Sequence, residues 1–156
     1  MIREASAADV PALADLARRT WLDAFGDSLS PEDAEAAADE TRSEERFRCA
    51  LGERTILVAE EDDALAGYAE LDDEWLHRLY VETALQGRGI GSTLLKAALA
   101  HPRLAAAPRV FLQVWEKNPR AIRLYERYGF RRFGTTSFEL AGEVVEDLVF
   151  VLEREP

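Results

Sequence analysis

The residues with the clearest chemical potential form a short glycine-rich loop. Glycines at positions 87, 89 and 91 follow an apolar, strand-like segment and precede a helix-like one. Glycine leaves the backbone N–H groups uncovered, and the N-terminus of a helix adds the positive end of its dipole. Arg88, within the loop, offers an additional charge contact. The segment therefore predicts a pyrophosphate-binding loop, and a glycine-rich turn without a ligand is the alternative.

The spacing of this loop excludes two other common phosphate-binding loops. A dinucleotide fingerprint needs a third glycine where this sequence has Ser92, and an acidic residue about 20 residues further on, where residues 110–112 are apolar. A P-loop needs a lysine directly after a glycine, but Lys96 lies well inside the expected helix.

The hydrophobic pattern supplies the elements that would position the loop. Residues 75–81 predict the strand before it, and 89–100 predict the helix after it, stopped by Pro102. Asp9 is expected to be the N-cap of the first helix, and Ser30-Pro31 to begin the second. The other expected strands are 2–4, 55–59, 64–71, 110–114, 130–138 and 144–152, and the other expected helices are 10–19, one from 31 onward, 43–51 and 118–129. This order, without repeats or linkers, predicts one α+β domain covering residues 1–156.

The charge of the chain limits its partners. A net charge of −11 argues against nucleic-acid binding, because phosphate neutralisation needs a basic face. Bases are concentrated in residues 103–132, which favours one locally held anionic ligand, while the acidic remainder of the surface favours cations. No apolar run approaches the roughly 20 residues that span a bilayer, so no membrane association is expected.

The cysteine and histidine content indicates neither disulfides nor a metal site. Cys49 is the single cysteine and is expected to pack without a chemical role. His77 and His101 are isolated, so no metal-ligand spacing is present. A reducing cytoplasm is the expected location.

Two ordered motifs resemble a known family. Gln86-x-x-Gly89-x-Gly91, preceded by Leu79-Tyr80-Val81, is similar to the acetyl-CoA signature of the GCN5-related N-acetyltransferases (GNATs). Some 30 residues later, the segment from Asn118 to Phe130 resembles the family's second signature, Asn-x-x-Ala-x-x-x-Tyr-x-x-x-Gly-Phe. The order of the expected strands and helices fits the same fold over nearly the whole chain.

The resemblance implies a fold and a cosubstrate. The fold is α+β, with a mixed, mostly antiparallel sheet of about seven strands, helices on both faces, and splayed fourth and fifth strands. The pantetheine arm of acetyl-CoA would lie in the gap, the loop would hold the pyrophosphate, and Asn118 would be a helix N-cap, a contact to the CoA arm, or both. The cofactor-binding residues that the resemblance implies are Leu79, Tyr80, Val81, Gln86, Gly87, Arg88, Gly89, Ile90, Gly91, Ser92 and Asn118.

The catalytic residues implied are a general acid and a base. Tyr125 matches the family tyrosine near the thioester sulfur, and a phenol with a pKa near 10 suits protonation of a leaving thiolate. A core aromatic is the alternative for Tyr125. His77 is the candidate base for the incoming amine, with Glu70, Glu74 or proton loss through water as rivals.

The acceptor is expected to be a small-molecule amine. The segments around Trp21 and Phe25, and the tail at 134–147, are similar to bacterial Pai-type polyamine acetyltransferases, which implies an acceptor such as spermidine or spermine bound by these two aromatics. Helix packing is the alternative reading for both residues. A protein N-terminal or lysine acetyltransferase and a non-catalytic acetyl-CoA sensor are the alternative functions. Dimers are frequent among similar proteins, so a homodimer is an open alternative to a monomer.

Overall fold

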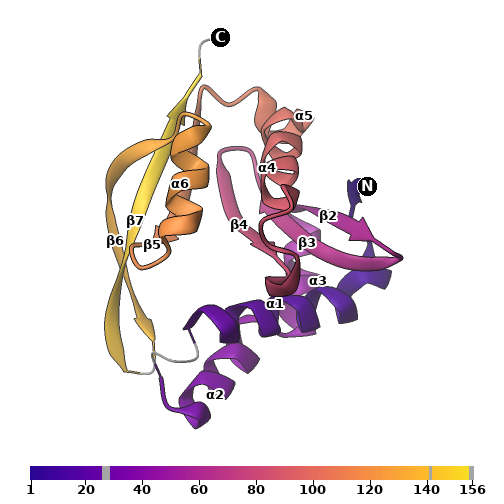
Figure 1. Cartoon of the computed structure of the whole chain (residues 1–156), viewed down its shortest axis with the longest axis vertical. Helices are drawn as coiled ribbons and strands as arrows, with labels where there is room; N and C mark the ends of the chain where they lie inside the picture. Colours follow the sequence, from indigo (N-terminus) through magenta and orange to yellow (C-terminus); the bar gives the residue numbers. More distant parts are fainter. Residues whose placement is uncertain (26–28, 141, 155–156) are drawn as a thin grey trace.

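The computed structural model describes residues 1–25, 29–140 and 142–154. Over these residues, seven strands form one sheet in the order β1-β2-β3-β4-β5-β7-β6 (Figure 1). The neighbours are antiparallel except for β4 and β5, which are parallel. The strands are β1 (Ile2–Glu4), β2 (Thr55–Glu61), β3 (Ala64–Leu71), β4 (Trp75–Val81), β5 (Arg109–Trp115), β6 (Arg131–Leu140) and β7 (Glu143–Glu153).

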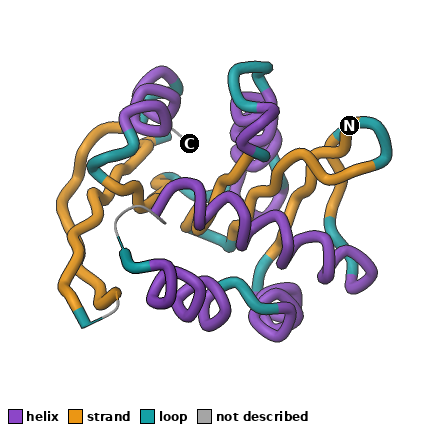
Figure 2. Tube along the Cα trace, turned by 60° about the horizontal axis from the view of Figure 1, so that its bottom comes forward, coloured by secondary structure: helices purple, strands orange, loops and turns teal. Residues whose placement is uncertain are grey.

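Helices cover both faces of this sheet (Figure 2). On one face, Leu13 of α1 and Phe47 of α3 pack against alternate residues of β2 and β3, such as Val58 and Tyr68. On the other face, Leu94 of α4 is part of the larger apolar cluster, together with residues of α6 and β5. The helices are α1 (Val10–Phe25), α2 (Pro31–Thr41), α3 (Glu44–Glu53), α4 (Ile90–Ala100), α5 (Pro102–Ala105) and α6 (Pro119–Arg127), with 3-10 turns at Ala7–Asp9 and Thr83–Leu85.

The parallel strands β4 and β5 separate soon after they meet. Their ladder consists of the pairs Trp75–Phe111 and Leu76–Leu112. On the other side of β4, Arg78 pairs with Glu70 but Leu76 pairs with the next residue of β3, so His77 is an extra residue in β4. Such a β-bulge bends its strand and increases the local twist. The bulge lies directly after the last β4–β5 pair, and beyond it the two strands diverge.

The fold class predicted from the sequence is confirmed, including the mixed sheet, the helices on both faces and the splayed strands. Each predicted strand is present, with ends that differ by at most two residues. None of the described helices is both long enough and apolar enough to cross a membrane.

Three local predictions need correction. Asp9 is not the N-cap of α1: it closes the preceding 3-10 turn, where its carboxylate accepts from the Ser6 amide and from both terminal nitrogens of Arg3. The helix α1 continues to Phe25 instead of ending at residue 19, because Trp21 is buried against Ala34 and Ala38 of α2 and fixes this last part of the helix. Pro102 does not only stop α4 but also begins the short helix α5.

Cys49 was expected to be packed. It is exposed on α3 instead, because the packed face of that helix is the one that carries Phe47.

Candidate active site

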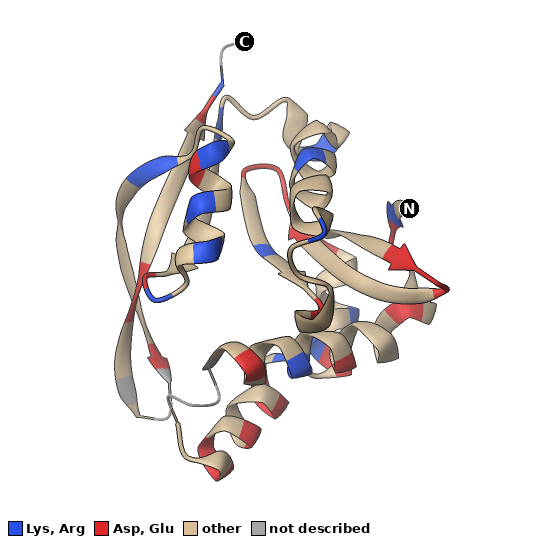
Figure 3. Ribbon diagram, viewed as in Figure 1, with Lys and Arg blue, Asp and Glu red and all other residues tan. Residues whose placement is uncertain are grey.

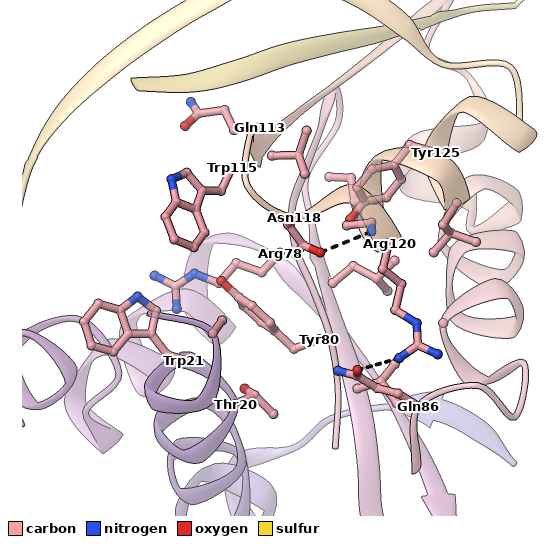
Figure 4. Close-up of a pocket in the computed structure, with 18 of the residues that line it drawn as sticks. Thr20, Trp21, Arg78, Tyr80, Gln86, Gln113, Trp115, Asn118, Arg120 and Tyr125 are labelled. Atoms are coloured by element: carbon pink, nitrogen blue, oxygen red, sulfur yellow. Dashed lines mark hydrogen bonds between the residues drawn. The ribbon is translucent and has the colours of Figure 1, made fainter. Parts of the chain in front are cut away.

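A cavity of about 710 Å³ follows the gap between β4 and β5. At one end it is lined by the glycine loop and the start of α4, and along its side by α6. At the other end it is lined by α1, β5 and the β6–β7 hairpin. Figure 4 shows Gln86, Arg120 and Tyr125 on one side of the strands, and Trp21 and Trp115 on the other. The cavity therefore connects the two faces of the sheet.

The loop end of the cavity has the geometry of an anion site. Gly87 and Gly89 have φ values of 87° and 83°, in the left-handed region that favours glycine. Gly89 is the N-cap of α4, so the first amides of this 11-residue helix have no partner within it. Free amides and the helix dipole at this position attract a negative group.

Basic side chains from α6 reinforce this end. Arg120 lines the cavity and donates to Oε1 of Gln86 at 2.8 Å, which ties the loop to α6 (Figure 4). Arg127, about two helical turns further along α6, also lines the cavity. Figure 3 shows several basic residues, in blue, along the ribbon of α6, whereas α2 and the β2–β3 turn carry acidic residues, in red. The anionic ligand expected from the charge pattern therefore has a basic wall beside the loop.

Arg88 differs from its neighbours in the loop. Its side chain is 62% exposed and lies 3.9 Å from Glu61, and it is not among the residues that line the cavity. Proximity in sequence suggested Arg88 as the charge contact, but α6 brings Arg120 to the cavity instead.

Tyr125 projects from α6 into the middle of the site. It is 6% exposed, and its ring packs edge-to-face on Phe130 with the centroids 5.9 Å apart. Among the described residues, no group hydrogen-bonds its hydroxyl. Burial raises the pKa of this phenol above its usual value, so the hydroxyl remains protonated at neutral pH.

His77, the residue of the β-bulge, is held by an acidic partner. Its Nε2 lies 2.7 Å from Oδ2 of Asp72, and its ring stacks on Trp75 with the centroids 6.2 Å apart. Burial acts to raise the pKa of Asp72, but the hydrogen bonds from His77 and from the amides of Glu74 and Trp75 outweigh burial and lower it to about 2. A charged Asp72 thus holds one ring nitrogen of His77 and leaves Nδ1 to accept a proton.

Trp21 lies at the opposite end, on the wall formed by α1. It is 4% exposed, packs against Ala34 and Ala38 of α2, and also lines the cavity. Arg42 lies over its ring at 5.6 Å and donates to the hydroxyl of Tyr80 at 3.1 Å. The side chain of Phe25, the other predicted acceptor residue, lies outside the described residues.

The remaining predictions divide into two groups. The alternative bases Glu70 and Glu74 do not line the cavity: Glu70 is buried against Arg54, and Glu74 is exposed in the turn before β4. Asn118 caps α6, accepting from the Ala121 amide at 3.3 Å, and also lines the cavity. The other predicted residues that line it are Tyr125, His77, Leu79, Tyr80, Val81, Gln86, Gly87, Gly89, Ile90, Gly91, Ser92 and Trp21.

Several lining residues were not predicted from the sequence. The most distinctive is Asp147 of β7, which pairs in register with Trp115 of β5. Its Oδ1 is buried without a hydrogen-bond partner, and burial raises the pKa of this carboxyl. Arg78 and Gln113 also line the cavity. Within the described part of the chain, no group of three His, Cys, Asp or Glu side chains is arranged to hold a metal ion.

Comparisons with known proteins agree with this geometry. Residues 11–130 match the model of the Acetyltransferase (GNAT) family. An uncharacterized N-acetyltransferase of Mycobacterium tuberculosis is 35% identical over 152 residues, which cover 93% of this chain and 97% of that protein. The spermine/spermidine N(1)-acetyltransferase of Bacillus subtilis is 37% identical over 75 residues, which cover 47% of this chain and 49% of that protein.

Solved structures share the fold at low sequence identity. The PaiA N-acetyltransferase of Thermoplasma acidophilum, in complex with coenzyme A, superposes with a TM-score of 0.83 at 23% identity, covering 99% of this chain and 98% of the other. A GCN5-related N-acetyltransferase of Rhodopseudomonas palustris superposes with a TM-score of 0.84 at 19% identity, covering 99% and 95% of the two chains.

Proposed function

The chain belongs to the acetyltransferase (GNAT) family, and we propose that it transfers the acetyl group of acetyl-CoA to a primary amine with Tyr125 as the general acid. Acetyl-CoA would supply the acetyl group as a thioester. The amine nitrogen would form a bond to the acetyl carbon, the carbon–sulfur bond would break, and coenzyme A would leave as the thiol. The observation that carries the proposal is the position of Tyr125: a buried, protonated phenol lines the same cavity as an amide-rich loop.

The residues of this chain fit coenzyme A. Gly87 and Gly89 supply a backbone with left-handed φ angles and uncovered amides for the diphosphate, with Arg120 adding positive charge. Beyond Leu76, the edge of β4 that faces β5 has no ladder partner among the described residues. Free strand edges accept extended ligands by main-chain hydrogen bonds, so Leu79 and Val81 are suited to the amides of the pantetheine arm.

The chemical step needs a base and an acid. The amine must lose a proton before its nitrogen attacks the thioester carbon, and the departing thiolate must gain one. Nδ1 of His77 is the candidate to take the first proton, directly or through water, because His77 lines the cavity and its Nε2 is held by Asp72. The Tyr125 hydroxyl donates the second.

The acceptor that we propose is a polyamine such as spermidine. The support is the local likeness to a spermine/spermidine N(1)-acetyltransferase, the net charge of −11, and a pocket end with the aromatic residues Trp21 and Trp115 and the carboxylate Asp147. Aromatic rings bind the aliphatic segments of a polyamine and attract its cationic groups.

Calorimetry and an acceptor panel test the proposal. Coenzyme A should bind the purified protein, and the release of free thiol from acetyl-CoA should depend on an added amine. The panel consists of spermidine, spermine, n-pentylamine and a peptide with a free N-terminus. Absence of coenzyme A binding would refute the proposal, whereas tight binding without turnover of any acceptor would favour an acetyl-CoA sensor.

A further inference from the structure

Asp147 lies on the face of the sheet opposite α6. Its register partner, Trp115, alternates along β5 with Val114, which belongs to the same buried cluster as Tyr125. Successive side chains on a strand point to opposite faces, and directly paired residues share a face. Asp147, Trp115 and Gln113 therefore line the cavity from the face covered by α1, and Tyr125 lines it from the other face.

The carboxylate of Asp147 has no counter-charge in the described part of the chain. Oδ1 is buried without a hydrogen-bond partner, and no ion pair involves this residue. A half-buried carboxylate in this condition destabilises the fold, because it loses hydration without gaining a donor. Burial raises its pKa for the same reason. A positively charged ligand in the cavity would supply the missing partner.

The surroundings decide where such a ligand would lie. Arg42 and Arg78 also line the cavity: Arg42 lies against Tyr80 and the ring of Trp21, and the guanidinium of Arg78 interacts electrostatically with Tyr68, Tyr80 and Glu70. Their positive charges disfavour a cation in their part of the cavity. Lys117 already lies over the Trp115 ring, 5.9 Å from its centroid, so the carboxylate of Asp147, and not the indole face, is the favourable position for an ammonium group on this wall.

We propose that Asp147 binds the ammonium group of the acceptor amine on the β7 wall, across the gap from Tyr125. The inference rests on the proposed acetyl transfer to an amine, and it names the residue that selects a cationic acceptor. The carboxylate accepts hydrogen bonds from the ammonium, and Trp115 contacts the adjoining carbon chain.

The first test compares two ligands of equal length on the unmodified protein. With coenzyme A bound, n-pentylamine and 1-pentanol are titrated separately and followed by NMR chemical shifts. The wild-type protein should bind the amine at least about tenfold more tightly than the alcohol, as expected for a hydrogen bond between charged groups. Equal binding of the two ligands, or binding of neither, overturns the assignment.

The second test removes the charge with Asp147→Asn and uses Glu146→Gln as the matched control, because Glu146 is exposed on the same strand and does not line the cavity. D147N should weaken n-pentylamine and spermidine by about 10- to 100-fold, leave 1-pentanol unchanged, and keep coenzyme A affinity within about twofold. E146Q should change none of these.

The melting temperature separates binding from a structural role. D147N should melt at or above the wild-type temperature, because it removes an unpaired carboxylate. A lower melting temperature with unaltered amine affinity overturns the proposal. Failure of the wild-type protein to bind coenzyme A would instead refute the proposed function.

Discussion

Replacing Tyr125 with phenylalanine removes only the hydroxyl group, so it tests the proposed role of that group as the general acid. Tyr125→Phe keeps the ring that packs on Phe130 and removes a hydroxyl to which no described group is bonded. The substitution therefore deletes no hydrogen bond within the protein. We expect the free energy of unfolding to stay within about 0.5 kcal/mol of wild type, the range of substitutions that disturb no packed or bonded group.

The expected loss of turnover follows from the acidity of this phenol. General acid catalysis contributes roughly 10²- to 10⁴-fold. Burial raises the pKa of Tyr125, whereas a thiol has a reference pKa near 8.5, so complete proton transfer from the phenol to the thiolate is unfavourable. We therefore expect a loss near the lower limit, about 100-fold in kcat, or about 2.7 kcal/mol in the activation barrier.

The assay is amine-dependent thiol release with acetyl-CoA in excess, together with calorimetry of coenzyme A. Y125F should lower kcat while the Kd for coenzyme A stays within about twofold. Tyr128→Phe is the control, because it makes the same change at the C-cap of the same helix: the Tyr128 hydroxyl bonds Ser92, and Tyr128 does not line the cavity. A Y125F enzyme with wild-type kcat, or with an equal loss in Y128F, would refute the role of Tyr125 as the acid.

Three further predictions concern the loop and the base. Gly89→Ala forces a side chain into the left-handed region at φ 83°, so calorimetry should show weaker coenzyme A binding and denaturation should show a loss of about 1–2 kcal/mol; unchanged values of both would contradict the loop geometry. Arg120→Gln removes a cation from the cavity wall, so the Kd for coenzyme A should rise about tenfold and depend less on salt, with the exposed Arg88→Gln as the control. Asp72→Asn keeps the oxygen that accepts the turn amides but loses the acceptor for His77, so kcat should fall while the turn persists. Because the folded-state pKa of Asp72 is lowered to about 2 from 3.8, its stabilisation, on the order of 2 kcal/mol, is present above about pH 4 and is lost as the pH falls toward 2. Urea unfolding at pH 6 and pH 2.5 should therefore show a smaller acid-dependent loss in D72N than in wild type, the remainder coming from other carboxylates with lowered pKa values, such as Asp9.

Local features explain what the sequence could predict. The loop from Gln86 to Gly91 and the helix start at Asn118 depend on neighbouring residues, so their patterns are visible without a structure. The same holds for the turn between β2 and β3, where Asp62 and Asp63 both have positive φ values. The succession of strands and helices along the chain also follows from local alternation, and the splayed fourth and fifth strands follow from the family resemblance.

Residues whose position depends on pairing between distant strands could not be predicted. Asp147 reaches the cavity because β7 pairs with β5 in a register that places it beside Trp115, 32 residues earlier in the chain. A shift of that register by one residue would turn its carboxylate to the other face. Similarly, Arg120 lines the cavity and Arg88 does not, because the packing of α6 beside the loop places the Arg120 side chain there.

The β-bulge at His77 is a local feature of β4 that also depends on the pairing of β4 with β3 and β5. It occurs where β4 loses its pairing with β5, so the residue that bends the strand is also the one whose ring borders the opening. The opening joins two chemically different environments: amides and arginines beside α6, and indole rings, two arginines and an unpaired carboxylate beside α1. The proposed anionic cosubstrate would be attracted to the amides and arginines beside α6, and the proposed cationic acceptor to Asp147, so the two would meet where the strands diverge. The position of Tyr125 and His77 at this divergence is therefore a consequence of strand geometry, and the selectivity that we propose for two oppositely charged substrates would follow from the two faces of one sheet.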